Sequence, residues 1–364
     1  MHPLRSSANV STLSQDGYGS VELHYLSGTG NTFRVAQWFA RAAARQGAVV
    51  RLSAIPSPDA PDLAASTSGR RLIGVLAPTH GFTAPWGAIV HAATVPDVRG
   101  ADVFVLVTRA GWYVGPFLLP GFEGTNAWLL ALLLAVRGGR LRGVGAIDMP
   151  SDWTALHWGM TDRHAATIVA RGEAKVAAFA ERVLGGQRRM TGRFVLLWGL
   201  LFVPVSLGYL AFARPALGRL FFADERCTSC GLCAKHCPFQ AIKMTGSGPA
   251  KPYWTLHCES CMRCMNLCPE QAIQASWLGA AALTWALIAV SGVTAALAAR
   301  FRVPLPDLAS AVAACLAMIA VTVPAYALAW AAGRTRAIAW LLGHLTPTRL
   351  YRRYHEPGTD LRRL

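Results

Sequence analysis

The chain has 364 residues, enough for two or three domains, and 53% of them are hydrophobic while only 15% are charged. This balance is too apolar for an ordinary soluble protein. The formal net charge is +16, but nucleic-acid binding needs a basic patch on a suitable fold, and neither is visible, so we expect no nucleic-acid partner.

The first half of the chain alternates between strand and helix patterns. Residues 1–20 contain no apolar core of a signal peptide and are expected to form a flexible lead. Strands are predicted at 21–26, 71–80, 101–111 and 143–150, and helices at 32–46, 127–136 and 164–186. The alternation predicts an α/β fold with a doubly wound parallel sheet. Residues 127–136 are very apolar but too short to cross a bilayer, so we expect a buried helix that covers the sheet.

A candidate phosphate-binding loop lies between the first strand and the first helix. Small and hydroxyl residues there leave backbone N–H groups free to face an anion at the positive end of the helix. The loop lacks the lysine of a P-loop, and Phe33 stands where the dinucleotide fingerprint needs its third glycine. The candidate residues are Ser27, Gly28, Thr29, Gly30, Asn31 and Thr32.

Eight of the nine cysteines form two runs with the spacing C-x2-C-x2-C-x3-C-P. This is the spacing of bacterial two-cluster ferredoxins, in which the fourth cysteine of each run ligates the other cluster. It predicts two [4Fe–4S] clusters, one held by Cys227, Cys230, Cys233 and Cys268 and the other by Cys258, Cys261, Cys264 and Cys237.

Two other uses of these cysteines are less consistent with the pattern. A zinc site would leave four cysteines and both following prolines unexplained, and disulfides are not expected without a signal peptide. The ninth cysteine, Cys315, stands alone in an apolar run and is expected to be an inert thiol.

The loop at 26–33 resembles that of flavodoxins, and the order of parts resembles the flavodoxin–ferredoxin fusion proteins of bacteria and archaea. The segments FFADERCTSCGLC and KPYWTLHCESCMRC are similar to their counterparts there. The resemblance covers residues 21–276 except for one insertion, the apolar stretch at 194–213. It implies a flavodoxin-like doubly wound parallel sheet, followed by a small α+β two-cluster ferredoxin domain.

The resemblance also implies a bound FMN, with its phosphate in the first loop and its ring between two later loops. The residues implied in these loops are Pro78, Thr79, His80, Gly81, Phe82, Thr108, Arg109, Ala110, Gly111, Trp112 and Tyr113. Four of them carry rings that could stack on the flavin: His80, Phe82, Trp112 and Tyr113. The insertion at 116–127 is longer than we expect for a flavodoxin.

Three charge-free runs, at 194–213, 271–299 and 308–333, are long enough to cross a bilayer. Arginine and lysine favour the cytoplasmic side of a membrane. If all three runs crossed, most of the flanking arginines would lie outside; if only the last two crossed, most would lie inside. We therefore expect transmembrane helices at 276–299 and 308–333. Pro204 could break the first run, so we expect a re-entrant or interfacial helical hairpin at 191–223; the rival is a full span.

These parts divide the chain into a lead at 1–20, an FMN domain at 21–190, the apolar segment at 191–223, a ferredoxin domain at 224–275, the two membrane helices, and a basic cytoplasmic tail at 334–364. The expected location is the cytoplasmic membrane of a bacterium, with both redox domains on the cytoplasmic face.

The expected function is that of a membrane-anchored electron-transfer iron–sulfur flavoprotein that works with a membrane-associated redox partner. No nicotinamide-binding domain is visible, so we expect electrons to arrive from another protein. The alternative is an FMN-dependent oxidoreductase acting on a quinone or another lipid-soluble substrate, with His80, Tyr113 and Asp148 as candidate proton donors. A cluster-bearing scaffold without turnover would not need both a flavin and two clusters.

Overall fold

The structure is a computed structural model that describes residues 17–56, 69–115, 117–246, 248–301 and 307–364. The predicted lead therefore lies outside the described residues as far as residue 16. The side chain of Cys315 also lies outside them.

The first domain is built on a parallel sheet with the strand order β2-β1-β3-β4-β6. Its strands are β1 (Tyr18–Tyr25), β2 (Val49–Ala54), β3 (Arg70–Pro78), β4 (Asp102–Val114) and β6 (Arg140–Pro150). Counted along the chain, this is the 2-1-3-4-5 order of the flavodoxin-like fold, which binds its ligand at the carboxyl ends of the strands near the β1/β3 switch point. The predicted parallel α/β sheet is confirmed.

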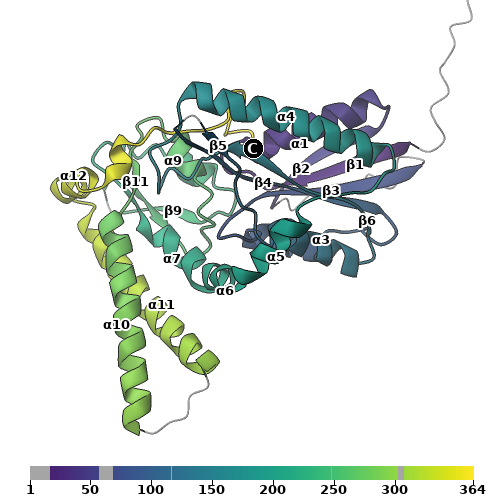
Figure 1. Cartoon of the computed structure of the whole chain (residues 1–364). Helices are drawn as coiled ribbons and strands as arrows, with labels where there is room; N and C mark the ends of the chain where they lie inside the picture. The colour runs from purple at the N-terminus through teal and green to yellow at the C-terminus, as the bar shows by residue number, and fades with distance from the viewer. Residues whose placement is uncertain (1–16, 57–68, 116, 247, 302–306) are drawn as a thin grey trace, which may run out of the picture.

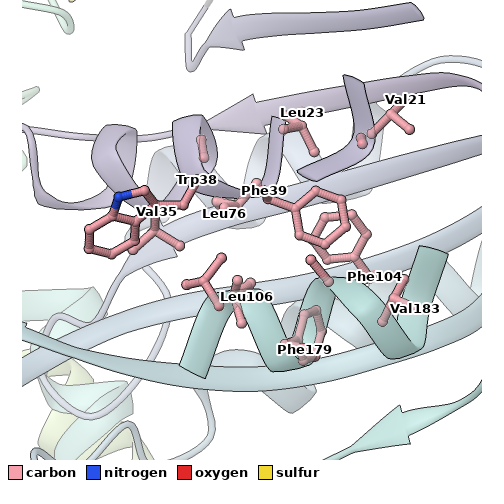
Figure 2. Packing of buried hydrophobic residues seen from close by; sticks show 14 of the residues in the cluster. Val21, Leu23, Val35, Trp38, Phe39, Leu76, Phe104, Leu106, Phe179 and Val183 are labelled. Atoms are coloured by element: carbon pink, nitrogen blue, oxygen red, sulfur yellow. The ribbon is translucent and has the colours of Figure 1, made fainter. Parts of the chain in front are cut away.

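Helices cover both faces of this sheet (Figure 1). Helices α1 (Asn31–Arg45) and α4 (Asp162–Leu184) lie on one face, and α2 (Trp86–Thr94) and α3 (Asn126–Val136) on the other. Figure 2 shows the first core, in which Phe39 of α1 stacks on Phe104 of β4 with ring centroids 4.3 Å apart. The apolar run at 127–136 is the helix over the sheet that the sequence predicts.

Four elements of this domain are absent from the sequence predictions. The residues of strand β2 alternate only weakly between apolar and polar, and the strand is only partly buried. Helix α2 follows a loop that supplies no capping side chain, so the sequence does not mark where it begins. Strand β5 (Phe117–Leu119) pairs antiparallel with the end of β4, so the long insertion at 116–127 begins as a hairpin. The two-residue strand β7 (Arg189–Met190) adds to the edge of the sheet beside β6.

The iron–sulfur domain is a small α+β unit made of two similar halves. Strand β8 (Phe221–Ala223) pairs with β11 (Ile273–Ala275), and β9 (Ile242–Thr245) pairs with β10 (Lys251–Trp254), both antiparallel. Each cysteine run carries one short helix, α8 (Leu232–Lys235) or α9 (Arg263–Leu267). Trp254 is fully buried in the hydrophobic core of this domain. Because β8 belongs to this unit, the domain begins at Phe221, three residues before the predicted boundary.

The apolar segment at 191–223 is a bent rod rather than a closed hairpin. It contains α5 (Arg193–Leu201), α6 (Val203–Gly208), a π-helical turn (Tyr209–Ala213), α7 (Arg214–Leu217) and a 3-10 turn (Gly218–Leu220). The helical pieces 193–201 and 203–220 meet at 69°. The break lies at Phe202, two residues before the predicted one, and Pro204 falls in the first turn of α6, where a missing N–H costs little.

The last two apolar runs form the long helices α10 (Trp277–Phe301) and α11 (Asp307–Ala332), which lead away from the iron–sulfur domain and back toward it (Figure 1). Within the described residues, no single helix satisfies both the length and the hydropathy expected of a membrane span, whereas the bent pair at 193–220 does so when its two pieces are taken together. Membrane insertion of α10 and α11 stays a prediction.

Residues 334–364 are folded onto the protein, which differs from the predicted basic tail. They form α12 (Arg336–His344) and a 3-10 turn (Pro347–Leu350), and then return to the flavodoxin-like domain (Figure 1). Glu356 and Leu361 are buried there. This stretch contains acidic and apolar residues as well as basic ones, and they contact both domains.

The buried histidine pair between β1 and α2 predicts acid sensitivity. The rings of His24 and His91 lie 4.7 Å apart, and burial lowers the pKa of His24 to about 3 and that of His91 to about 4. The pKa of a histidine side chain in the unfolded chain is about 6.5, so below that pH the unfolded chain binds protons that the folded chain does not. The stabilisation is complete above pH ~6.5 and falls by about 1.4 kcal/mol per pH unit and histidine as the pH drops toward the folded values.

We expect His24→Gln to reduce the loss of stability between about pH 7.5 and 5.5, measured as the denaturation midpoint at each pH. His344→Gln is the matched control because the His344 side chain is exposed. An unchanged pH dependence in the His24 variant would contradict the assignment.

Candidate functional site

A cavity of about 140 Å³ opens at the carboxyl ends of β1, β3 and β4, where the fold places ligands. Twelve of the predicted FMN-binding residues line it: Ser27, Gly28, Thr29, Asn31, Thr32, Pro78, Thr79, His80, Gly81, Thr108, Arg109 and Ala110. The three loops therefore converge on one space, as the resemblance implies.

The other five predicted residues do not line this cavity. Gly30 enters α1 in the left-handed conformation, and Gly111 packs against α4. The ring of Phe82 packs on Phe122 and Phe202. Trp112 lies edge-on to His157 and Tyr113 stacks on His164 at 4.0 Å. Three of the four rings expected on the flavin are thus engaged elsewhere.

Other segments of the chain complete the walls and were not predicted. They are residues 149–153 at the end of β6 and directly after it, Tyr209 and Leu217 of the apolar segment, and Ser260, Cys261 and Met262 of the second cysteine run. The first group could have been found, because β6 was predicted to end at Pro150 and parallel strands end at the same edge. The other two depend on tertiary packing, and no sequence signal shows them.

The first turn of α1 is suited to a phosphate. Its N-cap residue, Gly30, has no side chain to cap the helix, and in the described structure the Phe33 N–H donates to the Ser27 hydroxyl at 3.3 Å, which leaves the N–H groups before it available to a ligand. The loop is held by neighbouring strands: the hydroxyls of Thr32 and Thr108 lie 2.9 Å apart, and the Asn31 amide donates to the carbonyl of Pro150 at 2.8 Å. A preformed loop costs less entropy on binding.

Asp152 lies beside this loop, where an anionic carboxylate would repel a phosphate. The Thr29 hydroxyl donates a hydrogen bond to it. Burial raises the pKa of Asp152, and the Thr29 hydrogen bond opposes this only in part. Burial thus disfavours the charged carboxylate, which is the form that would repel a phosphate.

The three candidate proton donors are not placed for acid catalysis. Burial lowers the pKa of His80 to about 4, so the ring is neutral at pH 7, and its Nδ1 lies 3.3 Å from the Tyr209 hydroxyl. Asp148 is outside the cavity lining and pairs with Arg109 at 2.8 Å and Lys175 at 2.7 Å. Although burial alone would raise it, these cations hold the pKa of Asp148 below its usual value. Tyr113 is stacked on His164, outside the lining.

The two redox domains touch directly at the phosphate loop. A Cβ atom on Gly28 would overlap the carbonyl of Cys261. The buried Arg263 side chain, two residues later, donates to the carbonyls of Ser27 at 2.5 Å, Gly28 at 3.2 Å and Leu364 at 2.9 Å. The second cysteine run therefore forms part of the cavity wall.

The eight cysteines fall into two groups by the charges that act on each thiol. Burial is the largest cause of the raised pKa of Cys233, and the cysteines that raise it further are Cys227, Cys268 and Cys230. Burial is also the largest cause for the pKa of Cys264, which is raised further by Cys258, Cys261 and Cys237, with Cys233 of the other group last. Each group joins three cysteines of one run to the fourth cysteine of the other.

Burial acts strongly on the second group, raising the pKa of Cys258 to about 12 and that of Cys261 to about 11. Backbone N–H groups also point at three of the sulfur atoms, those of Cys237, Cys258 and Cys268, at 3.3 to 3.4 Å. Such hydrogen bonds tune cluster potentials. Among the described residues, no three His, Cys, Asp or Glu side chains are close enough to share a single metal ion.

Comparison with protein families identifies a 4Fe-4S binding domain at residues 221–243, which contains the first cysteine run. No curated protein sequence matches the chain. The chain thus combines a flavodoxin-like α/β domain with a 4Fe-4S binding domain that holds eight cysteines.

The solved structures named below match less than half of this chain. Flavodoxin 2 from Bacillus cereus is 20% identical, with a TM-score of 0.31, over 44% of this chain and 98% of that one. Rubredoxin oxygen:oxidoreductase from Desulfovibrio gigas is 14% identical, with a TM-score of 0.28, over 45% of this chain. The match spans 37% of that protein and 39% of the flavodiiron protein from Giardia intestinalis. The fold assignment rests on the strand order and not on these matches.

The tight contact at Gly28 generates a prediction. In Gly28→Ala, the added methyl group must displace the Cys261 backbone, so we expect a loss of about 1–3 kcal/mol in the free energy of unfolding. The measurement is the denaturant midpoint of the full chain.

Gly248→Ala is the matched control because a Cβ there meets no atom within 4 Å in the described structure. We expect that variant to stay within about 0.5 kcal/mol of the native chain. Equal stability of the two variants would show that the domain contact is looser than described.

Proposed function

We propose that this protein is a membrane-attached electron-transfer protein that passes electrons between an FMN bound in the first cavity and two [4Fe–4S] clusters. The observation that carries this proposal is that Cys261 and the phosphate loop at 27–32 line the same cavity. FMN exchanges electrons in pairs or singly and each cluster takes one, so together they connect two-electron donors with one-electron acceptors.

The residues present fit both groups. The open N-terminus of α1 and the hydroxyls of Ser27, Thr29 and Thr32 would hold the phosphate, and the loops at 78–81 and 108–110 would flank the ring. Cys227, Cys230, Cys233 and Cys268 would hold one cluster, and Cys258, Cys261, Cys264 and Cys237 the other. The grouping of thiols by mutual charge supports this assignment.

The cysteines extend from the wall of the interior cavity to the surface of the protein. Cys261 lies at the cavity wall, whereas Cys230 of the first run is exposed. We infer that a redox partner docks near Cys230. The net charge of +16 suits an acidic soluble redox partner such as a ferredoxin.

Membrane attachment belongs to the same proposal. The apolar segment exposes Phe194, Leu197, Trp198, Leu201 and Leu207, each more than half accessible, while its other face packs on the flavodoxin-like domain. A helix with such an exposed apolar side is suited to lie in a membrane interface. Helices α10 and α11 would cross the bilayer as a pair.

The direct contact between Gly28 and Cys261 supports one membrane side for both redox domains. A full span at 194–213 would separate them. The proposal therefore keeps both on the cytoplasmic face of the bacterial inner membrane, with the bent segment lying against that face.

The cofactors are tested by an anaerobic redox titration of the detergent-purified chain, followed by optical and EPR spectra. We expect FMN and two interacting reduced [4Fe–4S] clusters. Cys230→Ala should leave the signal of a single, isolated cluster together with FMN, because the second group keeps all its ligands.

Cys315→Ala is the control and should retain both clusters. Purified native chain with clusters but no flavin would refute the role given to the first domain. Two interacting clusters in the Cys230 variant would refute the ligand assignment.

The membrane arrangement is tested with a membrane-impermeant maleimide on whole cells. Cysteines introduced as Arg188→Cys and Arg362→Cys should react only after the cells are opened, since both belong to the cytoplasmic side. Arg300→Cys, in the last turn of α10, should react in intact cells. Labelling of position 188 in intact cells, or recovery of the native chain in the soluble fraction, would contradict the arrangement.

A further inference from the structure

The final segment of the chain places one arginine, Arg353, beside the second cysteine run. The backbone N–H of the next residue, Tyr354, donates to the side-chain oxygen of Asn266 in α9 at 2.8 Å. The Nη2 atom of Arg353 donates to the carbonyl of Ile273 in β11, also at 2.8 Å. Cys268 lies between Asn266 and Ile273 in the sequence, so Arg353 is held against the loop that carries this cysteine.

The sulfur of Cys268 is fixed by the same loop. The N–H of Ala272 points at this sulfur at 3.4 Å, and the next residue carries the carbonyl that binds Arg353. Burial, followed by the charge of Arg226, lowers the pKa of Arg353 to about 10, while the charges of Cys268 and Cys264 oppose this. Arg353 is therefore still a cation at neutral pH, and it is close enough to both thiols to be influenced by them.

Two donor atoms of Arg353 lack an acceptor. Its Nε and Nη1 atoms are buried and have no hydrogen-bond partner within the described residues, whereas Nη2 has the Ile273 carbonyl and the Gln274 side-chain oxygen. A buried donor without an acceptor is costly and rare in a folded protein, so it points to an acceptor outside the chain. A [4Fe–4S] cluster held by Cys268 would supply sulfur acceptors at this place.

The neighbouring cations are neutralised by carboxylates, unlike Arg353. Arg226 forms an ion pair with Asp224 at 2.6 Å, and Arg349 forms one with Glu225 at 2.7 Å. The hydrogen bonds of Arg353 go to a carbonyl and an amide oxygen instead. Asp224 also raises the pKa of Arg353, but less than either thiol does. The cysteine sulfur atoms are therefore its main counter-charges.

We propose that Arg353 tunes the reduction potential of the outer cluster, which is the one held by Cys268 and the first three cysteines of the first run. Reduction adds one negative charge to a cluster, and a fixed cation nearby stabilises the more negative state and raises the potential. The outer cluster is affected more than the other, because Cys268 acts on Arg353 more strongly than Cys264 does. This inference rests on the clusters and ligands of the proposed function.

This tuning gives the two clusters different roles. The inner cluster, held by the second group of cysteines, includes Cys261 at the wall of the candidate FMN cavity, whereas the outer cluster includes the exposed Cys230. One electron passes between them: the inner cluster is oxidised, the outer cluster is reduced, and no bond or proton changes. A higher potential at the outer cluster holds the electron at the surface end, where we infer that the redox partner docks.

The test is an anaerobic redox titration of the detergent-purified full chain, in which each midpoint potential is read from EPR spectra. In Arg353→Gln, we expect the equilibrium constant for reduction of the outer cluster to fall about tenfold, which is about 59 mV for a one-electron couple. Arg353→Lys keeps the charge and should stay within about threefold of the native chain. Arg363→Gln is the matched control and should change nothing, because the Arg363 side chain is 87% exposed.

Two further variants assign the effect. In Cys230→Ala only the inner cluster remains, so adding Arg353→Gln should change its reduction equilibrium constant by less than about threefold. Arg353→Met fills the same space without a charge and should reproduce the tenfold fall, and it replaces the Gln variant if that one loses its clusters. The cluster absorbance verifies that each variant is folded and loaded.

Unchanged midpoint potentials in the variants without a charge at position 353 would overturn the proposal. A shift as large in Arg353→Lys as in Arg353→Gln would do the same, because it would come from altered packing, and so would a larger shift at the inner cluster than at the outer one. Failure of the proposed function has a different signature, because the native chain itself would then lack the signals of two clusters.

Discussion

The buried guanidinium of Arg263 holds together the two halves of the candidate redox site. It is 5% exposed and donates hydrogen bonds to carbonyl groups of the phosphate loop, of the first cysteine run and of the last residue of the chain. Burying a cation is costly unless its N–H groups are satisfied. Here main-chain oxygen atoms of three segments satisfy them, so the hydrogen bonds of this cation persist only while all three segments stay in place. The Gly28–Cys261 contact depends on this arrangement.

The apolar segment at 191–223 has two roles because its two faces differ. One face packs on the first domain: Ser206 donates to the carbonyl of Gly81 at 3.0 Å, and the Tyr209 ring lies against Gly81, where a Cβ would collide with it. The other face is apolar and exposed. This segment, which we propose to lie on the membrane, is therefore also a wall of the candidate FMN cavity. A change in its position would alter its contacts with His80 and Gly81.

The final segment of the chain connects the helical pair to the phosphate loop. After α12, the chain crosses the iron–sulfur domain, where the backbone N–H of Tyr354 donates to the Asn266 side-chain oxygen at 2.8 Å. It then reaches α1, where Glu356 pairs with Arg34 and its N–H donates to the carbonyl of Thr29 at 2.8 Å. Through these contacts, α10 and α11 are tied to the same loop that Arg263 holds.

The sequence by itself determined the local features of this protein. Strand and helix periods in residues 21–186 predict the parallel sheet, because its buried strands are almost wholly apolar and its helices amphipathic. The cysteine spacing predicts the crossed grouping of thiols, and the strand–loop–helix pattern predicts the phosphate loop. Each of these signals lies within one short stretch of chain.

Only the tertiary structure decided which distant segments share a cavity. Tyr209, Asp152 and Cys261 have no local pattern that links them to the loop at 27–32, and three of the four rings expected on the flavin pack on other partners. The position of residues 351–364 against that loop likewise depends on contacts with distant segments, which no local pattern shows. The physical reason is that such contacts arise from shape and charge matched across the folded chain, whereas periodicity and spacing report only on neighbours along it.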